Sequence, residues 1–413
     1  MTTDARTSAP AHPPERGLLR LLGPAFVAAI AYVDPGNVAA NLTAGAGYGY
    51  LLLWVLVAAN AMAVLVQYLS AKLSVVTGST LPELLRARLG TKARLAYWGQ
   101  AELVAAATDL AEVIGGAVAL KLLFGTPLLV GGLVVGLVSL GLLMLQNRDG
   151  VRRFEAAVVA LLLVIVVGFV SGVLLAPPDA SEAAAGLVPR FEGSETVLLA
   201  ASMLGATVMP HAVYLHSAMA RDHHGPVAPH RTRRVLGATR VDVLAALLVA
   251  GVVNISMLLL AASALRGVEG TDTLEGAHAA VATHLGTGAA LLFAIGLLAS
   301  GLASTSVGAY AGAVIMQGLL HVDVPLLVRR VVTLVPALIC LGAGVDPTRA
   351  LVVSQVVLSF GIPFALIPLV ALTSSRSLMG AHVNRRGTHL AAVTAVALVV
   401  ALNVALLWLT FTG

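Results

Sequence analysis

Seven residues interrupt an apolar segment near the start of the chain, Ala31-Tyr32-Val33-Asp34-Pro35-Gly36-Asn37, within residues 21–40. The proline removes a backbone donor and the following glycine relaxes φ, so we expect a helix that unwinds here. Unwinding frees carbonyl groups, such as that of Ala31, beside the side chains of Asp34 and Asn37. Carboxylates and free carbonyls at membrane depth line cavities or bind ligands. The segment therefore predicts an oxygen-rich half-shell for a cation. The alternative, a proline kink with a satisfied aspartate, leaves Asp34 without a partner.

The composition identifies a polytopic membrane protein of the all-α class. The chain has 413 residues, of which 58% are hydrophobic and only 11% are charged, and no soluble domain of this size has such a balance. The formal charge of +5 is not a nucleic-acid signal, because the basic residues fall in short loops between apolar segments. The single cysteine, Cys340, lies in an apolar run, so neither a disulfide framework nor a thiol metal motif is expected.

Charges, glycines and prolines divide the chain into segments long enough to span a bilayer, at about 20 residues each. The eleven expected spans are approximately 21–47 (broken), 51–76, 95–121, 126–146, 154–175, 196–220 (broken), 238–265, 286–319, 327–345, 348–372 and 388–411. The segment 286–319 is expected to include an interfacial turn at residues 284–288.

The distribution of basic residues predicts the orientation of these spans. With the N-terminus inside, all but four of the 25 lysine and arginine residues fall on the cytoplasmic side, the exceptions being Lys121, Arg190, Arg266 and Arg349. The positive-inside rule then places the N-terminus in the cytoplasm and the C-terminus outside. Residues 1–20 are expected to form a polar cytoplasmic tail. The expected location is a bacterial-type inner membrane.

A second broken span corresponds to the first. Residues 196–220 carry Met209-Pro210-His211 at their centre, and each broken span opens a block of five spans. An odd number of spans makes the two blocks inverted, and paired interrupted segments in two inverted halves indicate the midplane site of a transporter. The predicted units are residues 21–175, residues 176–372, and a loop with an eleventh helix at residues 373–413.

The two breaks together suggest a transition metal. Asp34 and Asn37 supply hard oxygen, Met209 supplies a thioether, and backbone carbonyls at Ala31 and Ala206 add further oxygen. Oxygen ligands alone suit Mg²⁺ or Ca²⁺, whereas sulfur favours softer ions. A mixed site with one carboxylate favours Mn²⁺ or Fe²⁺. Taken alone, Met209 would be an ordinary packing residue; its place before Pro210 favours the ligand role.

Three carboxylates occupy one face of the third span. Glu102, Asp109 and Glu112 are spaced by seven and three residues, which places them on the same helical face. Such a face lines water, pairs with cations or relays protons, and the candidate partners are His211, Arg329 and Arg330. For Asp109 and Glu112 the favoured role is proton conduction. For Glu102, a static salt bridge between helices is an equal alternative.

Three amides lie within apolar spans: Gln67, Asn254 and Gln355. Each either forms a hydrogen bond between helices, which is the commoner role, or is part of a gate near the ion path. Gln355 is the best candidate for an additional metal ligand in an occluded state.

The sequence resembles the Nramp family of proton-coupled divalent-metal transporters. The resemblance rests on Asp34-Pro35-Gly36-Asn37, on Met209-Pro210-His211 and on residues 301–320, and it covers the chain after the N-terminal tail. It implies a LeuT-type fold with two inverted five-helix repeats plus an eleventh helix, and Mn²⁺, Fe²⁺, Cd²⁺ or Co²⁺ as substrates. It further implies metal binding by Asp34, Asn37, Met209, Ala31 and Ala206, and a proton route through Asp109, Glu112, His211, Arg329 and Arg330. Asp34 is expected to be shared by the metal and the proton, because a bound cation releases the proton of its ligand. Family members often carry polar residues around Leu302 and Ala313, where this chain is apolar.

The expected function is therefore import of divalent metals with protons by alternating access. A LeuT-type symporter of another small substrate, such as an amino acid, is the alternative. It would have no use for Asp34 beside Met209. An enzyme is not expected, because no HExxH or similar histidine pair is present. The expected partners are metal ions, protons and the lipid bilayer, with no cofactor, no nucleic acid and a monomeric state.

Overall fold

The computed structural model describes residues 23–412 except 150, 272 and 323, and in this part the chain forms helices and connecting turns only. The first half contains α1 (Pro24–Ile30), the short 3-10 helix η2 (Ala31–Val33), α2 (Pro35–Tyr48), α3 (Leu53–Thr77), α4 (Leu81–Arg86), α5 (Thr91–Phe124), α6 (Leu128–Asp149) and α7 (Val151–Leu175). The second half contains α8 (Ala180–Ala185), α9 (Gly193–Thr207), α10 (Pro210–His224), α11 (Pro229–Ala264), α12 (Leu274–Leu285), α13 (Thr287–Leu320), α14 (Leu326–Gly342) and α15 (Pro347–Thr373). The chain ends with α16 (Arg376–Met379), η3 (Gly380–His382) and α17 (Arg386–Thr412).

Every expected span has a helix or a helix pair at its place. Within the described residues, eight helical segments are long and apolar enough to cross a membrane: α3, α5, residues 156–175 of α7, α9 joined to α10, α11, α13, α15 and residues 386–409 of α17. The other three expected spans correspond to the broken segment α1–η2–α2, to α6 and to α14. The expected tail, residues 1–20, lies outside the described residues.

Helix boundaries differ from the expected spans where a helix continues beyond its apolar part. Helix α11 begins at Pro229, well before residue 238, because the basic residues that precede the span are themselves helical. The expected turn near residue 286 is present. Gly286 separates α12 from α13 with φ of 93°, a value that glycine adopts without strain.

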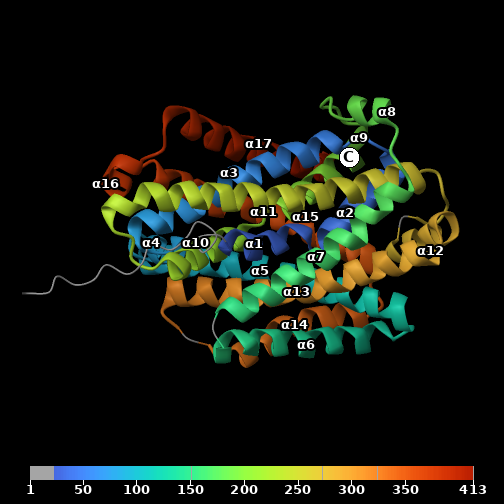
Figure 1. Ribbon diagram of the computed structural model, residues 1–413, viewed down its shortest axis with the longest axis horizontal. Coiled ribbons are helices and arrows are strands. Elements are labelled where there is room, and N and C mark those ends of the chain that lie inside the picture. Colours follow the sequence, from blue (N-terminus) through green and yellow to red (C-terminus); the bar gives the residue numbers. More distant parts are fainter. Residues whose placement is uncertain (1–22, 150, 272, 323, 413) are drawn as a thin grey trace, which may run out of the picture.

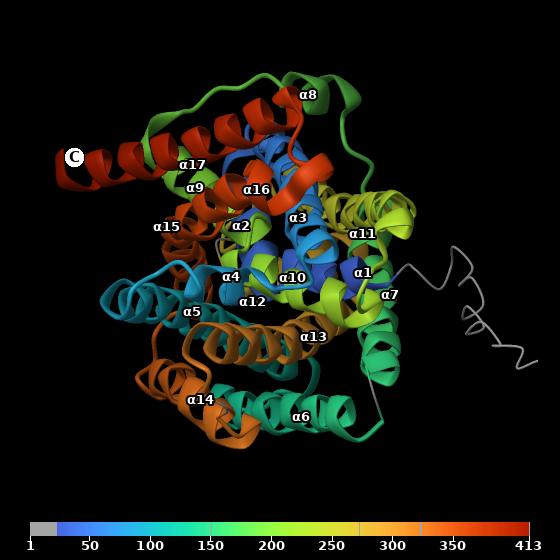
Figure 2. The same cartoon turned by 90° about the vertical axis from the view of Figure 1, so that its left-hand side faces the viewer.

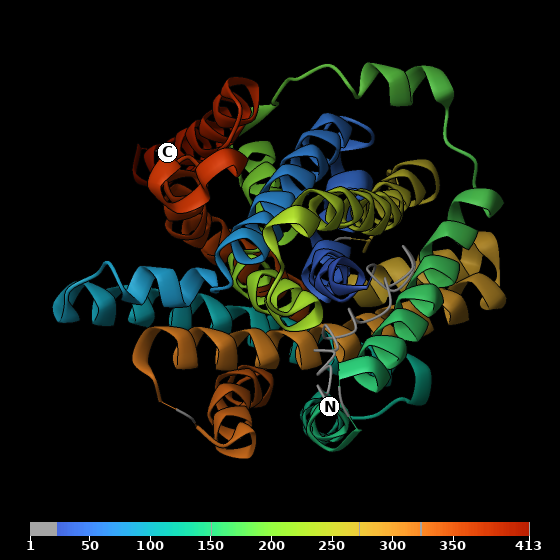
Figure 3. The same ribbon diagram turned by 60° about the vertical axis from the view of Figure 1, so that its left-hand side comes forward.

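The broken helices occupy the middle of the molecule. In Figures 1 and 2, α1, α2 and α10 are enclosed by α3, α11, α13 and α5, while α6 and α14 lie along one edge. The opposite edge is formed by α17, which packs on α15 and α9 (Figure 3). This arrangement buries both breaks in the interior of the protein. The division into repeats at residues 21–175 and 176–372 stays a prediction.

Small residues bring α5 and α13 into close contact. A Cβ atom on Gly301 would lie 2.9 Å from the Cα of Gly116, so the two backbones approach as closely as small residues allow in membrane helices. Further along α13, a Cβ on Gly308 would lie 2.8 Å from Oε2 of Glu112. The glycine thus makes room for a carboxylate between the two helices.

Candidate metal-binding site

The first break forms as the sequence predicts. Helix α1 ends at Ile30, η2 continues to Val33, and Asp34 adopts an extended conformation before Pro35 starts α2. Asp34 is the N-cap of α2, and its Oδ1 accepts a hydrogen bond from the backbone N–H of Asn37 at 2.7 Å. Local chemistry therefore fixes the carboxylate at the break, because aspartate satisfies the exposed N–H groups of a helix start.

Two carbonyl groups of the break are held by side chains from neighbouring helices. The carbonyl of Tyr32 accepts from Nδ2 of Asn254 in α11 at 2.6 Å, and that of Val33 accepts from Oγ of Ser300 in α13 at 2.6 Å. Asn254 also accepts from Nδ2 of Asn41 in α2 at 3.0 Å. Asn254 thus forms hydrogen bonds between helices, and one of them stabilises the unwound segment.

The second break faces the first. Helix α9 ends at Thr207, Val208 and Met209 follow in non-helical conformations, and Pro210 starts α10. Met209 is fully buried. Both C-terminal half-helix ends, of η2 and α9, carry the negative end of the helix dipole into the region between the breaks, which favours a cation there.

Asn37 connects the two breaks. Its Nδ2 donates to the carbonyl of Ala206 at 3.0 Å and to Oδ1 of Asp34 at 2.7 Å, and its Oδ1 accepts from Oγ1 of Thr207 at 3.4 Å. The structure therefore brings together Asp34, Asn37 and the Ala206 carbonyl, three of the expected ligands. Ala31 is buried at the first residue of η2, on the same unwound segment.

Gln355 of α15 completes the group around Asp34. Its Nε2 donates to Oδ2 of Asp34 at 3.3 Å, and its Oε1 is buried without a hydrogen-bond partner. Gly36 leaves room for it, because a Cβ at that position would displace the end of the Gln355 side chain from where it lies. An unpaired buried oxygen next to a carboxylate is an available ligand for a cation.

The charge of Asp34 has no cationic partner in the described part of the chain. Asp34 is fully buried, and the hydrogen bonds to its carboxylate come from neutral amide groups of Asn37 and Gln355. A buried carboxylate of this kind is costly unless a cation or a proton neutralises it. No group of three or more His, Cys, Asp or Glu residues among the described residues could hold a metal ion, so a metal at this site would rely on amide, carbonyl and thioether atoms as well.

Gln67 joins the first break to the second broken helix. Its Nε2 donates to the hydroxyl of Tyr32, and its Oε1 lies 2.6 Å from Nδ1 of His216 in α10. All three side chains are buried. Gln67 therefore forms hydrogen bonds between helices, one of them with His216.

The acidic face of α5 divides into paired and unpaired carboxylates. Glu102 forms an ion pair with Arg329 of α14 at 2.9 Å, and Asp109 forms an ion pair with Arg330 of the same helix. Glu112 is fully buried, and neither of its oxygen atoms has a hydrogen-bond partner. The three acids share one face as expected, but only two of them meet the arginine pair.

His211 contacts α5 through a residue beside Asp109. Its Nδ1 lies 3.3 Å from Oγ1 of Thr108, and its Nε2 is buried without a partner. His211 thus contacts the acidic helix through Thr108 rather than through a carboxylate.

Sequence reasoning missed several polar residues that hold the site in place. They are Asn41, Thr108, Thr207, Ser300 and Asp242, whose carboxylate accepts the backbone N–H groups of Gly23 at 2.9 Å and Ala25 at 3.0 Å. Each is a hydroxyl, amide or carboxylate inside an expected span. That pattern was available as a signal, because such groups in apolar helices bond across helices.

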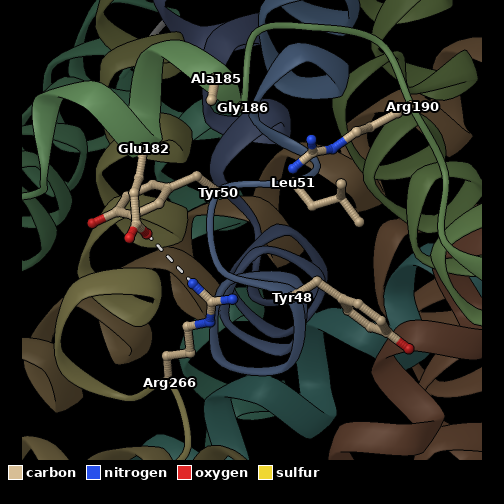
Figure 4. Close-up of a pocket in the computed structure, with 8 residues that line it drawn as sticks. All are labelled: Tyr48, Tyr50, Leu51, Glu182, Ala185, Gly186, Arg190 and Arg266. Atoms are coloured by element: carbon tan, nitrogen blue, oxygen red, sulfur yellow. Dashed lines mark hydrogen bonds and ion pairs between the residues drawn. The ribbon is translucent and has the colours of Figure 1, made fainter.

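A pocket of about 230 Å³ lies apart from the metal site, at the ends of α2 and α3 beneath α8. Figure 4 shows Arg190 and Arg266 entering it from opposite sides, with Tyr50 and Glu182 on its wall. Arg266 forms an exposed ion pair with Glu182 at 3.4 Å, which contributes little to stability. Two of the four basic residues that are expected on the non-cytoplasmic side, Arg190 and Arg266, therefore line this pocket. None of the expected metal ligands lines it.

Comparison with known proteins identifies related sequences across nearly the whole chain. The family described as natural resistance-associated macrophage protein-like (Nramp) matches residues 25–409. The divalent metal cation transporter MntH of Mycobacterium tuberculosis (strain ATCC 25618 / H37Rv) is 61% identical over 95% of this chain and 92% of its own length. The protein of the same name from Bacillus subtilis (strain 168) is 47% identical over 96% of this chain and 93% of its own.

Solved structures give the same result for the fold. The manganese transporter of Eremococcus coleocola, crystallised with an aromatic bis-isothiourea compound, is 31% identical and superposes with a TM-score of 0.84 over 97% of this chain and 89% of its own. MhsT in complex with L-phenylalanine reaches a TM-score of 0.63 at 14% identity, over 94% of this chain and 97% of its own. The latter likeness concerns the LeuT-type fold alone.

Proposed function

Since the chain belongs to the Nramp family and is a membrane transporter of divalent metal cations, we propose that it imports Mn²⁺, with Fe²⁺, Cd²⁺ and Co²⁺ as further substrates, together with protons. One observation carries this proposal. Asp34 lies fully buried between two broken helices, and the groups that hydrogen-bond its carboxylate are neutral. A carboxylate in this position needs a mobile positive charge, and a metal ion and a proton can each supply one.

The proposed metal ligands are Asp34, Asn37, Met209, Gln355 and the carbonyls of Ala31 and Ala206. Asn37 now donates to Asp34 and to Ala206, so a metal ion would replace these hydrogen bonds and the amide would turn its oxygen inward. The Met209 thioether selects for softer ions over Ca²⁺ and Mg²⁺, which prefer oxygen ligands. In this chemistry the metal is the transported substrate.

The proposed proton route begins at the same carboxylate. A divalent ion lowers the proton affinity of its ligands, so metal binding would release a proton from Asp34. Asp109 is the proposed acceptor, with Arg330 as its ion-pair partner. Glu112 and His211 lie near it, and Glu102 and Arg329 lie beyond. His211 is suited to carry or orient a proton because imidazole exchanges protons readily.

The remaining features of the proposal concern topology. We infer that the chain lies in a bacterial-type inner membrane as a monomer, with its N-terminus in the cytoplasm and its C-terminus outside. The distribution of basic residues supports this orientation. Alternating access would proceed by movement of one five-helix repeat against the other around the broken helices.

An amino-acid symporter is the competing function, and the site argues against it. Symporters of this fold bind a substrate carboxylate at exposed helix N-termini, whereas here the carboxylate of Asp34 already caps α2. A second anion at this place would be repelled.

Uptake into proteoliposomes tests the proposal. Purified protein is reconstituted and given radiolabelled Mn²⁺ or a mixture of labelled amino acids, with and without an acidic exterior. We expect saturable Mn²⁺ uptake that the pH gradient stimulates and that Asp34→Asn abolishes, with no amino-acid uptake. Amino-acid uptake without Mn²⁺ uptake would overturn the proposal, and Mn²⁺ uptake indifferent to the gradient would remove its proton component.

A further inference from the structure

Helix α15 contains two internal prolines, Pro363 and Pro368. Proline has no backbone N–H, so it leaves the carbonyl four residues earlier without its helical hydrogen bond. The two carbonyls concerned belong to Ser359 and Phe364. Backbone carbonyls inside a membrane protein need another donor, and each of these two receives one from a different helix.

The carbonyl of Ser359 is satisfied by Asn403 of α17. Nδ2 of Asn403 donates to this carbonyl at 2.9 Å, and Oγ of Ser359 donates to Oδ1 of Asn403 at 2.6 Å. Asn403 is 5% exposed and Ser359 is fully buried. The amide therefore replaces the missing N–H of Pro363 and fixes α17 to α15 through two reciprocal hydrogen bonds.

The carbonyl of Phe364 is satisfied by Tyr97 of α5. The Tyr97 hydroxyl donates to this carbonyl and also lies 2.6 Å from the hydroxyl of Tyr214 in α10. Each proline of α15 is thus matched by one side chain that supplies a donor from outside the helix.

The first of these two connections lies next to the metal site. Ser359 is one turn after Gln355 on the same helix, and Nε2 of Gln355 donates to Oδ2 of Asp34 at 3.3 Å. A Cβ on Gly205 of α9 would lie 2.9 Å from the backbone nitrogen of Ser359. The turn of α15 between Gln355 and Ser359 therefore rests directly on the end of α9 that carries Ala206.

We propose that Asn403 is a positioning residue for metal binding: it holds α15 at Pro363 so that Gln355 reaches Asp34. The inference rests on the proposed function only in taking Asp34 and Gln355 as parts of the metal site. It gives a role to α17, which stands outside the two predicted repeats and in Figure 2 lies against α15 and α9. The eleventh helix then contributes to the metal site without touching the metal.

The test is a double-mutant cycle on Mn²⁺ uptake by the full-length protein. Asn403→Leu removes both hydrogen bonds, and we expect the KM for Mn²⁺ to rise about tenfold, the low end of what outer partners of metal ligands contribute. Gln355→Ala should raise the KM by itself. If Asn403 acts through Gln355, adding Asn403→Leu to Gln355→Ala changes the KM no further.

Tyr97→Phe is the matched control. It removes the hydrogen bond to a proline-freed carbonyl of the same helix and the contact with the Tyr214 hydroxyl. Phe364 lies more than two turns beyond Gln355, so we expect the KM to remain that of the wild type. Ser359→Ala is the second variant, for the case in which Asn403→Leu does not fold. It removes only the hydroxyl bond to Asn403, and we expect a smaller rise in KM in the same direction.

Three results would overturn the proposal. The first is an unchanged KM in folded Asn403→Leu. The second is that Asn403→Leu raises the KM as much in the Gln355→Ala background as in the wild type, and the third is that Tyr97→Phe raises the KM as much as Asn403→Leu does. In the fallback case, an unchanged KM in Ser359→Ala would overturn it. A failure of the proposed function looks different, because the wild type itself would then show no Mn²⁺ uptake.

Discussion

The ion pair between Asp109 and Arg330 is nearly sealed from solvent, and this makes a simple test of its proton role misleading. The two side chains are 5% and 3% exposed, and the Nε and Nη2 atoms of Arg330 are buried without another partner. Asp109→Asn would therefore leave a buried guanidinium without its counter-charge. Breaking a buried pair in this way costs about 3–5 kcal/mol, a large share of the roughly 5–15 kcal/mol that stabilises a typical folded protein.

A charge-neutral double variant separates stability from proton transfer. Asp109→Asn with Arg330→Gln removes both charges, so the uncompensated guanidinium disappears and most of the lost stability should return. The proton acceptor is still absent. The control is Glu83→Gln with Arg221→Gln, an ion pair between α4 and α10 that lies outside the proposed proton route and whose side chains are 34% and 31% exposed.

The assay combines three readings on the same preparations: thermal unfolding in detergent, Mn²⁺ binding, and metal-stimulated proton influx in proteoliposomes. We expect Asp109→Asn to unfold at a markedly lower temperature. The double variant should unfold close to the wild type and bind Mn²⁺, yet conduct no metal-stimulated protons, while the control pair conducts them. Wild-type proton influx in the Asp109 and Arg330 double variant would show that this pair only joins helices, and the acceptor role would fall.

The remaining predictions concern the metal ligands and one ion pair outside the membrane. Asp34→Asn should nearly abolish Mn²⁺ binding measured by calorimetry, because the only formal negative charge among the ligands is lost; wild-type affinity would contradict its role. Met209→Ala should lose Cd²⁺ strongly and Mn²⁺ modestly while Ca²⁺ begins to compete, and a competition assay in which Ca²⁺ stays excluded would refute the selectivity argument. Partial burial alone would raise the pKa of Glu83, but hydrogen bonds from Thr80 and the 2.6 Å ion pair with Arg221 outweigh it and lower that pKa. Its stabilising effect is then complete above the ordinary carboxyl pKa and is lost as the pH falls through the lowered value. The unfolding temperature of Glu83→Gln should therefore lack the part of the fall at low pH that protonation of Glu83 causes in the wild type. If the unfolding temperatures of the two proteins depend on pH in the same way, the stabilising role of the ionised Glu83 is refuted.

The two breaks were predictable because their chemistry is local. Proline, glycine and an N-capping aspartate act within a few residues of themselves, so Asp34-Pro35-Gly36-Asn37 determines where α2 begins without help from the rest of the chain. The same holds for Pro210 at the start of α10. The spacing of Asp109 and Glu102 on α5 was likewise enough to place both on one face, and the arginine pair of α14 was named as a candidate partner.

The partners of single polar groups were not predictable, because they depend on how helices far apart in the sequence are rotated and shifted. Nothing in the sequence around Gln67 indicates that it joins Tyr32 to His216, or that Asn254 holds the Tyr32 carbonyl. Gln355 was named as an additional ligand, yet its position above Gly36 follows from the packing of α15 on α2. Such contacts require the packed structure.

The contrast between Asp109 and Glu112 suggests how one helix face can serve two purposes. Asp109 has a counter-charge beside it, because Arg330 forms an ion pair with its carboxylate. Glu112 lies a turn further with both oxygens buried and unpaired, next to the space that Gly308 leaves, and an ionised carboxylate in that position would be costly. Of the two carboxylates, only Asp109 has an ion-pair partner among the described residues. A proton taken up by Asp109 removes the charge that balances Arg330, so the ion pair re-forms only when that proton moves on. If Glu112 is the next carrier, it must release any proton of its own before it accepts this one.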